Sequence, residues 1–217
     1  MIILFVHQKG GVGKSTAAIN TAYEFRKWFK DIAMFDLDSQ NSVKLFNTLR
    51  SSAKHKTIDC FTQQEIEFEK LVKKYKGNKK NILVIDSGGY DSQINRHALV
   101  EADILITPVG ISQIELFGLQ KFRKILKEAS SYLKKNVKSN ILLNNVDPRS
   151  KKAIKSVREY IKKNNEYFNL LDTTLHTRAD YKHSYAKGVS VKEYNKKGDA
   201  AKEIKSLSKE IKDIILN

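Results

Sequence analysis

The sequence predicts an α/β fold in which a mostly parallel, twisted sheet carries helices on both of its faces. Apolar segments of strand length alternate along the chain with segments whose apolar residues recur at helical spacing. The strand segments are apolar almost throughout, which is typical of a parallel sheet buried on both faces. At 217 residues the chain is long enough for a full core, and we expect a single domain over residues 1–217.

The expected elements follow from these two patterns. The predicted strands cover residues 2–7, 32–36, 82–86, 104–109, 140–146 and 170–175. The predicted helices cover residues 14–30, 40–50, 63–76, 93–102, 113–132, 151–165 and 199–216. In a parallel sheet the ligand lies beyond the carboxyl ends of the strands, so the polar residues that follow each strand are the candidates for function.

The first such segment is a glycine-rich loop, residues 9–16, with the sequence Lys-Gly-Gly-Val-Gly-Lys-Ser-Thr. It joins the first predicted strand to the first predicted helix, and in that setting the backbone N–H groups and the helix amino end favour phosphate. Lys14 is expected to contact the β- and γ-phosphates, and the Ser15 hydroxyl to bind Mg²⁺. The other loop residues expected to line the nucleotide are Gly10, Gly11, Val12, Gly13 and Thr16. The loop refines the predicted fold to a Rossmann-like P-loop NTPase domain.

Carboxylates follow two further strands. Asp36 and Asp38 end the second strand, where they could face the nucleotide and orient Mg²⁺ or the attacking water. An alternative is that Asp38 or Ser39 caps a helix that starts near residue 40. Asp86 ends the apolar run of residues 82–85, and a buried carboxylate there is costly without a partner such as Mg²⁺.

The loop after Asp86 contains two adjacent glycines, Gly88 and Gly89. We interpret this pair as a place where the loop could move when a γ-phosphate is present, because glycine has access to positive φ.

The charge is strongly positive and uneven. The formal net charge is +16, and residues 121–217 hold 24 Lys and Arg against 11 Asp and Glu. This half is expected to bind a polyanion, with nucleic acid ahead of acidic lipid, although a generally lysine-rich surface is the alternative. No apolar run approaches the roughly 20 residues that span a bilayer, and one cysteine, Cys60, excludes an internal disulfide. We therefore expect a cytoplasmic protein.

Taken together, these motifs resemble the ParA/MinD group of deviant Walker-type ATPases. The resemblance rests on the loop at residues 9–16, on Asp36-Leu37-Asp38-Ser39-Gln40-Asn41-Ser42 and on Ile85-Asp86. Further similar blocks are residues 143–149, Arg178 and residues 188–194. Two positions differ: Ser39 replaces the proline of the family's Asp-Pro-Gln, and Gly88-Gly89 replaces a frequent proline pair.

The resemblance implies an ATP-driven dimer in which two subunits enclose two ATP molecules. Lys9 would then cross to the phosphates of the partner's nucleotide, as an arginine finger does. The residue matching Asp38 would position or activate water, and the one matching Asp86 would hold Mg²⁺. Asn144 resembles the adenine-reading asparagine of the family, with Asn145 beside it as the competing assignment.

Within the family, the favoured hypothesis is a short partition ATPase that moves plasmid or chromosomal DNA. It would bind nucleoid DNA without sequence preference as an ATP-loaded homodimer, and a cargo-bound ParB-like protein would stimulate hydrolysis. The candidate DNA contacts, of which Arg178 has the best family match, are Arg149, Lys151, Lys152, Lys155, Arg158, Arg178 and Lys182.

Two alternatives remain. A MinD-type membrane-cycling ATPase would need an amphipathic anchor, whereas the apolar stripe of the last helix is expected to pack on the core, so no membrane binding is expected. A metabolic ATPase or ligase with the same loop would leave the basic half unexplained.

Overall fold

Seven strands form one sheet within residues 1–89 and 92–216, which are the residues that this computed structural model describes. The strand order is β3-β2-β4-β1-β5-β6-β7, and every neighbouring pair among them is parallel. The chain builds outward from β1 to β3, returns at β4 and then crosses to the other side of β1. The carboxyl ends of the central strands therefore meet at one edge, beside the point where the strand order reverses. The predicted fold class is confirmed.

The strands are β1 (Ile2–Phe5), β2 (Asp31–Asp36), β3 (Asp59–Thr62), β4 (Asn81–Asp86), β5 (Ile104–Val109), β6 (Ser139–Val146) and β7 (Phe168–His176). The helices are α1 (Lys14–Phe25), α2 (Ser42–Ser52), α3 (Phe68–Tyr75), α4 (Gln93–Glu101), α5 (Gln113–Leu133), α6 (Lys151–Lys163), α7 (Ala179–Ala186), α8 (Val191–Tyr194) and α9 (Asp199–Leu216).

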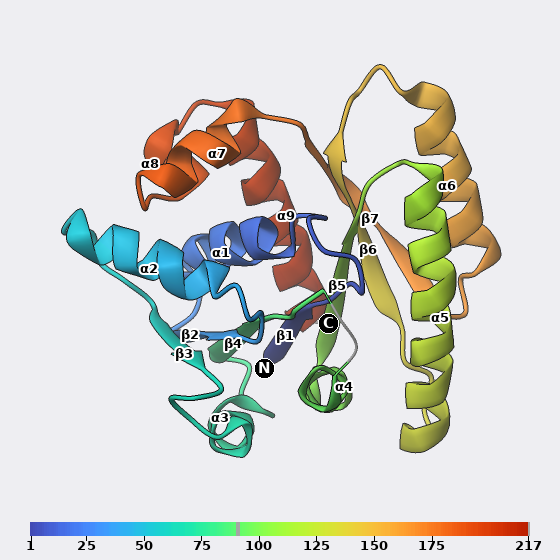
Figure 1. Cartoon of the computed structure of the whole chain (residues 1–217), viewed down its shortest axis with the longest axis horizontal. Helices are drawn as coiled ribbons and strands as arrows, with labels where there is room; N and C mark the ends of the chain where they lie inside the picture. Colours follow the sequence, from blue (N-terminus) through green and yellow to red (C-terminus); the bar gives the residue numbers. More distant parts are fainter. Residues whose placement is uncertain (90–91, 217) are drawn as a thin grey trace.

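Helices cover both faces of the sheet, and each face has its own core. On one face α1, α2 and α9 pack on the sheet, with α7 and α8 above them, as Figure 1 shows. On the other face α3, α4, α5 and α6 pack on the sheet. The strands supply side chains to both cores alternately, for example Leu4 to one and Phe5 to the other. This two-sided burial explains why the strands are apolar at consecutive positions.

Three elements were absent from the sequence-based expectation. Strand β3 has only four residues at the edge of the sheet, and α7 and α8 lie between residues 176 and 198, where no element was predicted. The predicted helix over residues 63–76 begins five residues later, at Phe68. Within the described part of the chain, none of the helices is both long and apolar enough to cross a bilayer.

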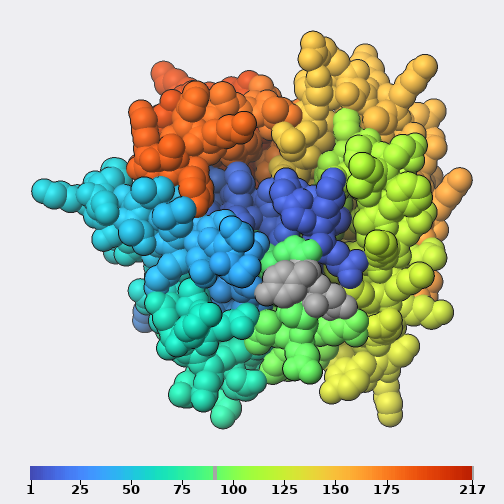
Figure 2. Space-filling model, viewed as in Figure 1, coloured from blue at the N-terminus to red at the C-terminus, as the bar shows by residue number. Residues whose placement is uncertain are grey.

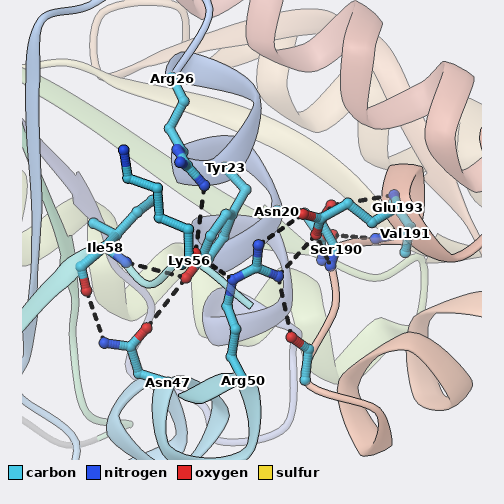
Figure 3. Close-up of polar contacts among 11 residues, drawn as sticks. Asn20, Tyr23, Arg26, Asn47, Arg50, Lys56, Ile58, Ser190, Val191 and Glu193 are labelled. Atoms are coloured by element: carbon cyan, nitrogen blue, oxygen red, sulfur yellow. Dashed lines mark hydrogen bonds and ion pairs between the residues drawn. The ribbon is translucent and has the colours of Figure 1, made fainter. Parts of the chain in front are cut away.

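A buried arginine joins α2 to the segment that carries α7 and α8 (Figure 3). Arg50 is only 2% exposed, and its guanidinium donates to both carboxylate oxygens of Glu193, at 2.7 and 2.9 Å. It also donates to the carbonyls of Lys56 and Gly188, and it lies 4.3 Å from the centre of the Tyr23 ring. A buried charge of this kind needs such a set of partners, so α2, α1 and the α7–α8 segment are held together at this point.

Candidate nucleotide-binding site

The glycine-rich loop wraps around the amino end of α1, as the sequence predicts. Gly11 and Gly13 have φ of 75° and 87°, a region that other residues rarely adopt. Gly13 is also the N-cap residue, and none of the described side chains caps the helix there. The first N–H groups of α1 are thus left for a ligand, and the helix dipole favours an anion at this end. Figure 2 shows this dark-blue segment reaching the surface between α2 and the start of α5.

Lys14 lies inside the loop rather than in solvent. Its side chain is buried, and its ammonium donates to the Lys9 carbonyl at 3.3 Å. Burial lowers the pKa of Lys14, whereas the nearby carboxyl groups of Asp86 and Asp38 act in the opposite direction. A buried cation against the loop backbone is placed to neutralise phosphate charge.

The register of the sheet brings Asp36 and Asp86 side by side at the ends of β2 and β4. Asp36 is bound to the protein itself: one carboxylate oxygen accepts from the backbone N–H of Asp38 at 3.1 Å. The other oxygen accepts from the N–H groups of Val43 and Lys44, at 2.9 and 3.1 Å. Asp36 therefore caps α2, in place of Asp38 or Ser39, and this bonding accounts for its burial at 2% exposed.

Asp86 is in the opposite situation. It is fully buried, and neither of its carboxylate oxygens has a hydrogen-bond partner among the described residues. Burial raises the pKa of Asp86 to about 8, against the effects of the Ser15 hydroxyl and Lys14. An unpartnered carboxylate of this kind costs free energy unless a cation or donor joins it.

The donor set around Asp86 fits Mg²⁺. Ser15 and Asp86 supply the hydroxyl and carboxylate oxygens that this ion prefers, and Asp38 lies close enough to act on the pKa of Asp86. In the described residues, no three acidic, histidine or cysteine side chains converge to hold a metal unaided. That is the expected arrangement for an ion that keeps water and completes its coordination on substrate phosphates.

Asp38 lies at the surface end of this group. It is partly exposed, and one of its carboxylate oxygens accepts from the backbone N–H of Gln40 at 3.0 Å. Among the described residues, no hydrogen bond reaches its other oxygen, so Asp38 is the carboxylate of this group best placed to contact a water beside the phosphates.

The two asparagines at the end of β6 have different surroundings. Asn144 is buried, and its amide donates to the Val12 carbonyl of the loop at 2.6 Å. A Cβ atom on Gly13 would lie 2.2 Å from the Asn144 amide nitrogen, so Gly13 must be glycine for spacing as well as for φ. Asn145 is exposed, has φ of 55° and accepts from the Thr177 hydroxyl at 2.9 Å. Asn144 thus holds the loop, and the adenine contact stays a prediction for either residue.

The glycine pair after β4 has another explanation than the one expected from sequence. Neither Gly88 nor Gly89 has a positive φ. A Cβ atom on Gly89 would lie 2.9 Å from the backbone nitrogen of Gly10. Glycine is required here because two loops approach closely, so this segment is in direct contact with the phosphate loop.

Lys9 has a partner that no sequence pattern predicts. Its ammonium is paired with the carboxylate of Glu115 in the first turn of α5. Its backbone N–H donates to Nδ1 of the buried His7 at 2.9 Å. Glu115 lies 106 residues away in a helix without any recognisable motif, and only the folded structure shows that the two side chains meet.

The candidate DNA contacts fall into two groups on neighbouring elements. Lys151, Lys152, Lys155 and Arg158 are exposed on α6, and Arg149 precedes this helix, where it pairs with Asp147 at 2.7 Å. Lys182 is exposed on α7, but Arg178 before it is paired with Glu203 of α9 at 2.8 Å. The two groups begin at the adjacent carboxyl ends of β6 and β7. The best family match among them is thus already bound within the chain.

Comparison with known proteins agrees with this geometry. Residues 3–191 match the family described as the CobQ/CobB/MinD/ParA nucleotide binding domain. No curated protein sequence matches the chain.

Solved structures resemble the chain over nearly its whole length. One is a Borrelia burgdorferi protein described as a plasmid partition protein, bound to AMPPNP (19% identity, TM-score 0.72, 98% of each chain covered). A second is a ParA family ATPase from Chlorobium tepidum (16% identity, TM-score 0.74, 95% of this chain and 98% of the other covered).

A third structure is the septum site-determining protein MinD of Pyrococcus horikoshii with Mg-ADP (15% identity, TM-score 0.73, 98% of this chain and 96% of the other covered). At these identities the solved structures establish only the shared fold. The family itself is established by the match over residues 3–191, which is most of the chain. The protein belongs to the CobQ/CobB/MinD/ParA family of nucleotide-binding domains.

Proposed function

We propose that this protein is a ParA-like ATPase that hydrolyses ATP and partitions DNA. The observation that carries the ATPase proposal is the unpartnered, fully buried carboxylate of Asp86 beside a phosphate loop with free helix N–H groups. Triphosphate and Mg²⁺ supply the charges that this site lacks. Bound Mg²⁺ would neutralise charge on the β- and γ-phosphates.

The chain's own residues have distinct parts in this reaction. Lys14 and the α1 amino end hold the phosphates, and Asp38 orients the attacking water. We expect Lys14→Ala to abolish ATP binding in isothermal titration calorimetry. We expect Asp38→Ala to bind ATP but to accumulate as an ATP-bound dimer. An Asp38→Ala protein with normal turnover would remove Asp38 from this role.

The dimer belongs to the same proposal. Lys9 lies at the entrance of its loop, outside the phosphate-binding turn, and its side chain is 40% exposed. Such a lysine is within reach of a second copy and adds positive charge to the transferring phosphoryl group, as a finger residue does.

DNA binding is proposed from charge and exposure. The basic residues of α6 form one solvent-facing surface, because Val157 and Ile161 on the opposite side are buried in the core. An exposed and positively charged helix face can bind the phosphate backbone of DNA without sequence preference. A ParB-like protein on the cargo would complete the cycle by stimulating hydrolysis.

A salt titration of DNA binding tests this part of the proposal. The triple variant K151Q/K152Q/K155Q should bind duplex DNA more weakly with ATP, and its slope of log affinity against log salt should fall by about one per lost phosphate contact. The matched control K73Q/K79Q/K80Q removes the same charge from exposed positions of the α3–β4 region. An equal loss of DNA affinity in both variants would show that only net charge matters and would contradict the assignment of the DNA contacts to α6.

A MinD-like membrane cycle is the second candidate, since one of the similar structures is a MinD protein. In this chain the apolar stripe of α9 is buried in the core, including Ile204, Leu207, Ile211 and Ile215. These apolar side chains pack in the core and are not available to a membrane. We therefore expect no co-sedimentation with anionic liposomes in the presence of ATP. ATP-dependent liposome binding would favour the membrane cycle instead.

A further inference from the structure

The ion pair between Lys9 and Glu115 joins an accessible side chain to a buried one. The Lys9 side chain is 40% exposed, whereas the Glu115 side chain is 7% exposed. Glu115 uses one carboxylate oxygen for Lys9, and the other has no hydrogen-bond partner among residues 1–89 and 92–216. Among these residues, the Lys9 ammonium is thus the group that compensates this buried charge.

Neighbouring residues hold this pair in place. A Cβ atom on Gly110, at the end of β5, would lie 3.4 Å from Cγ of Glu115, so the arm of the glutamate packs over this glycine. Gly118 stands inside α5, where glycine lowers helix stability, and a Cβ there would lie 2.9 Å from Cε1 of His7. His7 in turn accepts the backbone N–H of Lys9. Lys9 is therefore held through its backbone by His7 and through its ammonium by Glu115.

This arrangement has an energetic consequence for any movement of Lys9. If the ammonium leaves Glu115, a buried carboxylate remains without a counter-charge, and such a separation is strongly unfavourable. Lys9 therefore moves only to a site that offers more negative charge than one carboxylate. A nucleoside triphosphate is such a site, and a diphosphate is a weaker one.

We propose that Glu115 is a positioning residue that keeps Lys9 within its own subunit until a second copy presents a bound triphosphate. This inference rests on the proposed dimer. Glu115 then sets the triphosphate concentration at which the subunits associate, and it disfavours association without nucleotide or with ADP.

The surface around the pair suits a second copy of the chain. Ile114 and Phe117 lie in the same turn of α5 as Glu115, and they are 64% and 60% exposed. Figure 2 shows the start of α5 beside the dark-blue loop segment on one open face. Large exposed apolar side chains next to a partly exposed charge are typical of a surface that is covered on association.

The test compares the AMPPNP concentration that makes half of the protein dimeric in sedimentation velocity with Mg²⁺. Glu115→Gln should lower this concentration about tenfold, which corresponds to about 1.4 kcal/mol. Glu115→Asp, which keeps the charge on a shorter arm, should lower it two- to fourfold. The matched control Glu128→Gln removes an exposed carboxylate of the same helix and should leave it unchanged. The double variant K9M/E115Q should behave like K9M alone, since the effect acts through Lys9.

Amine labelling of the nucleotide-free protein gives a second readout. With a succinimidyl ester probe and mass spectrometry, Lys9 should react several-fold faster in Glu115→Gln than in the wild type, and at the wild-type rate in Glu128→Gln.

A wild-type protein that stays monomeric with AMPPNP would overturn the dimer proposal, and labelling would still decide whether Glu115 holds Lys9. Unchanged Lys9 labelling, or a half-dimer concentration in Glu115→Gln that equals or exceeds the wild-type value, overturns the inference.

Discussion

Replacement of Asp86 by asparagine is expected to stabilise the nucleotide-free protein while it destroys Mg²⁺-dependent nucleotide binding. Burial raises the pKa of Asp86 from 3.8 to about 8, so this carboxyl group is protonated in the folded protein at pH 7 and ionised in the unfolded chain. The folded state binds the extra proton, and the free energy of unfolding therefore falls as the pH rises from about 4 to about 8.

The magnitude follows from the pKa difference. Between pH 3.8 and pH 7 the loss amounts to about 4 kcal/mol, at 1.36 kcal/mol for each pH unit. The asparagine in D86N is neutral in both states and avoids this loss, while its amide is as unpaired as the protonated carboxyl group. We expect D86N to exceed the wild type by about 2 to 4 kcal/mol in free energy of unfolding at pH 7.

Urea denaturation at pH 5, 6.5 and 8 in EDTA measures this difference, with the single tryptophan, Trp28, as the fluorescent probe. The advantage of D86N should grow with pH and then level off above pH 8. With Mg-ATP the order should reverse, because only the wild type gains stability from the ligand. Asp59→Asn, at an exposed position on the edge strand, is the control. A D86N protein that is less stable than the wild type, or whose advantage is constant between pH 5 and 8, would refute the reasoning.

Three further predictions concern the same structure. Arg50→Met should lower the free energy of unfolding by about 2 kcal/mol in urea, since it unpairs a partly exposed carboxylate. Burial lowers the pKa of His7 to about 4, so the free energy of unfolding of the wild type falls as the pH drops from 6.5 to 4. In His7→Asn, urea denaturation at several pH values should show this fall reduced by up to about 3 kcal/mol. Gly13→Ala should weaken ATP binding at least about 100-fold by calorimetry, because it strains φ and collides with Asn144, whereas Gly77→Ala, with a similar φ and open space, should bind normally.

The sequence predicts the elements whose signals are local. The phosphate loop, the central strands and the amphipathic helices each carry their pattern within a few consecutive residues, and the structure has all of them. Strand β3 has four residues with only two buried side chains, and α8 has a single turn, so neither contains enough of a repeat to be recognised.

The roles of individual site residues depend on contacts between distant segments. The motif around Asp36 is the same whether its side chain faces a nucleotide or caps α2. The role depends on the path of residues 37–44, which brings the N–H groups of Val43 and Lys44 to the Asp36 carboxylate. Glu115 has no sequence pattern at all, because its partner is brought to it by the order of the strands. Arg178 shows the reverse case, since a convincing motif match proves to be paired with Glu203.

Helix α2, about 16 Å long, is held at both ends by polar contacts. Its amino end is tied to Asp36 beside the nucleotide site, and its carboxyl end is clamped by Arg50 to the segment that carries α7 and α8. The Tyr185 hydroxyl of α7 donates to the Ser42 carbonyl at 2.8 Å, which links α7 to the start of α2. Helix α2 and the α7–α8 segment are thus braced against each other between the Asp36 end of the nucleotide site and the exposed face that carries Lys182.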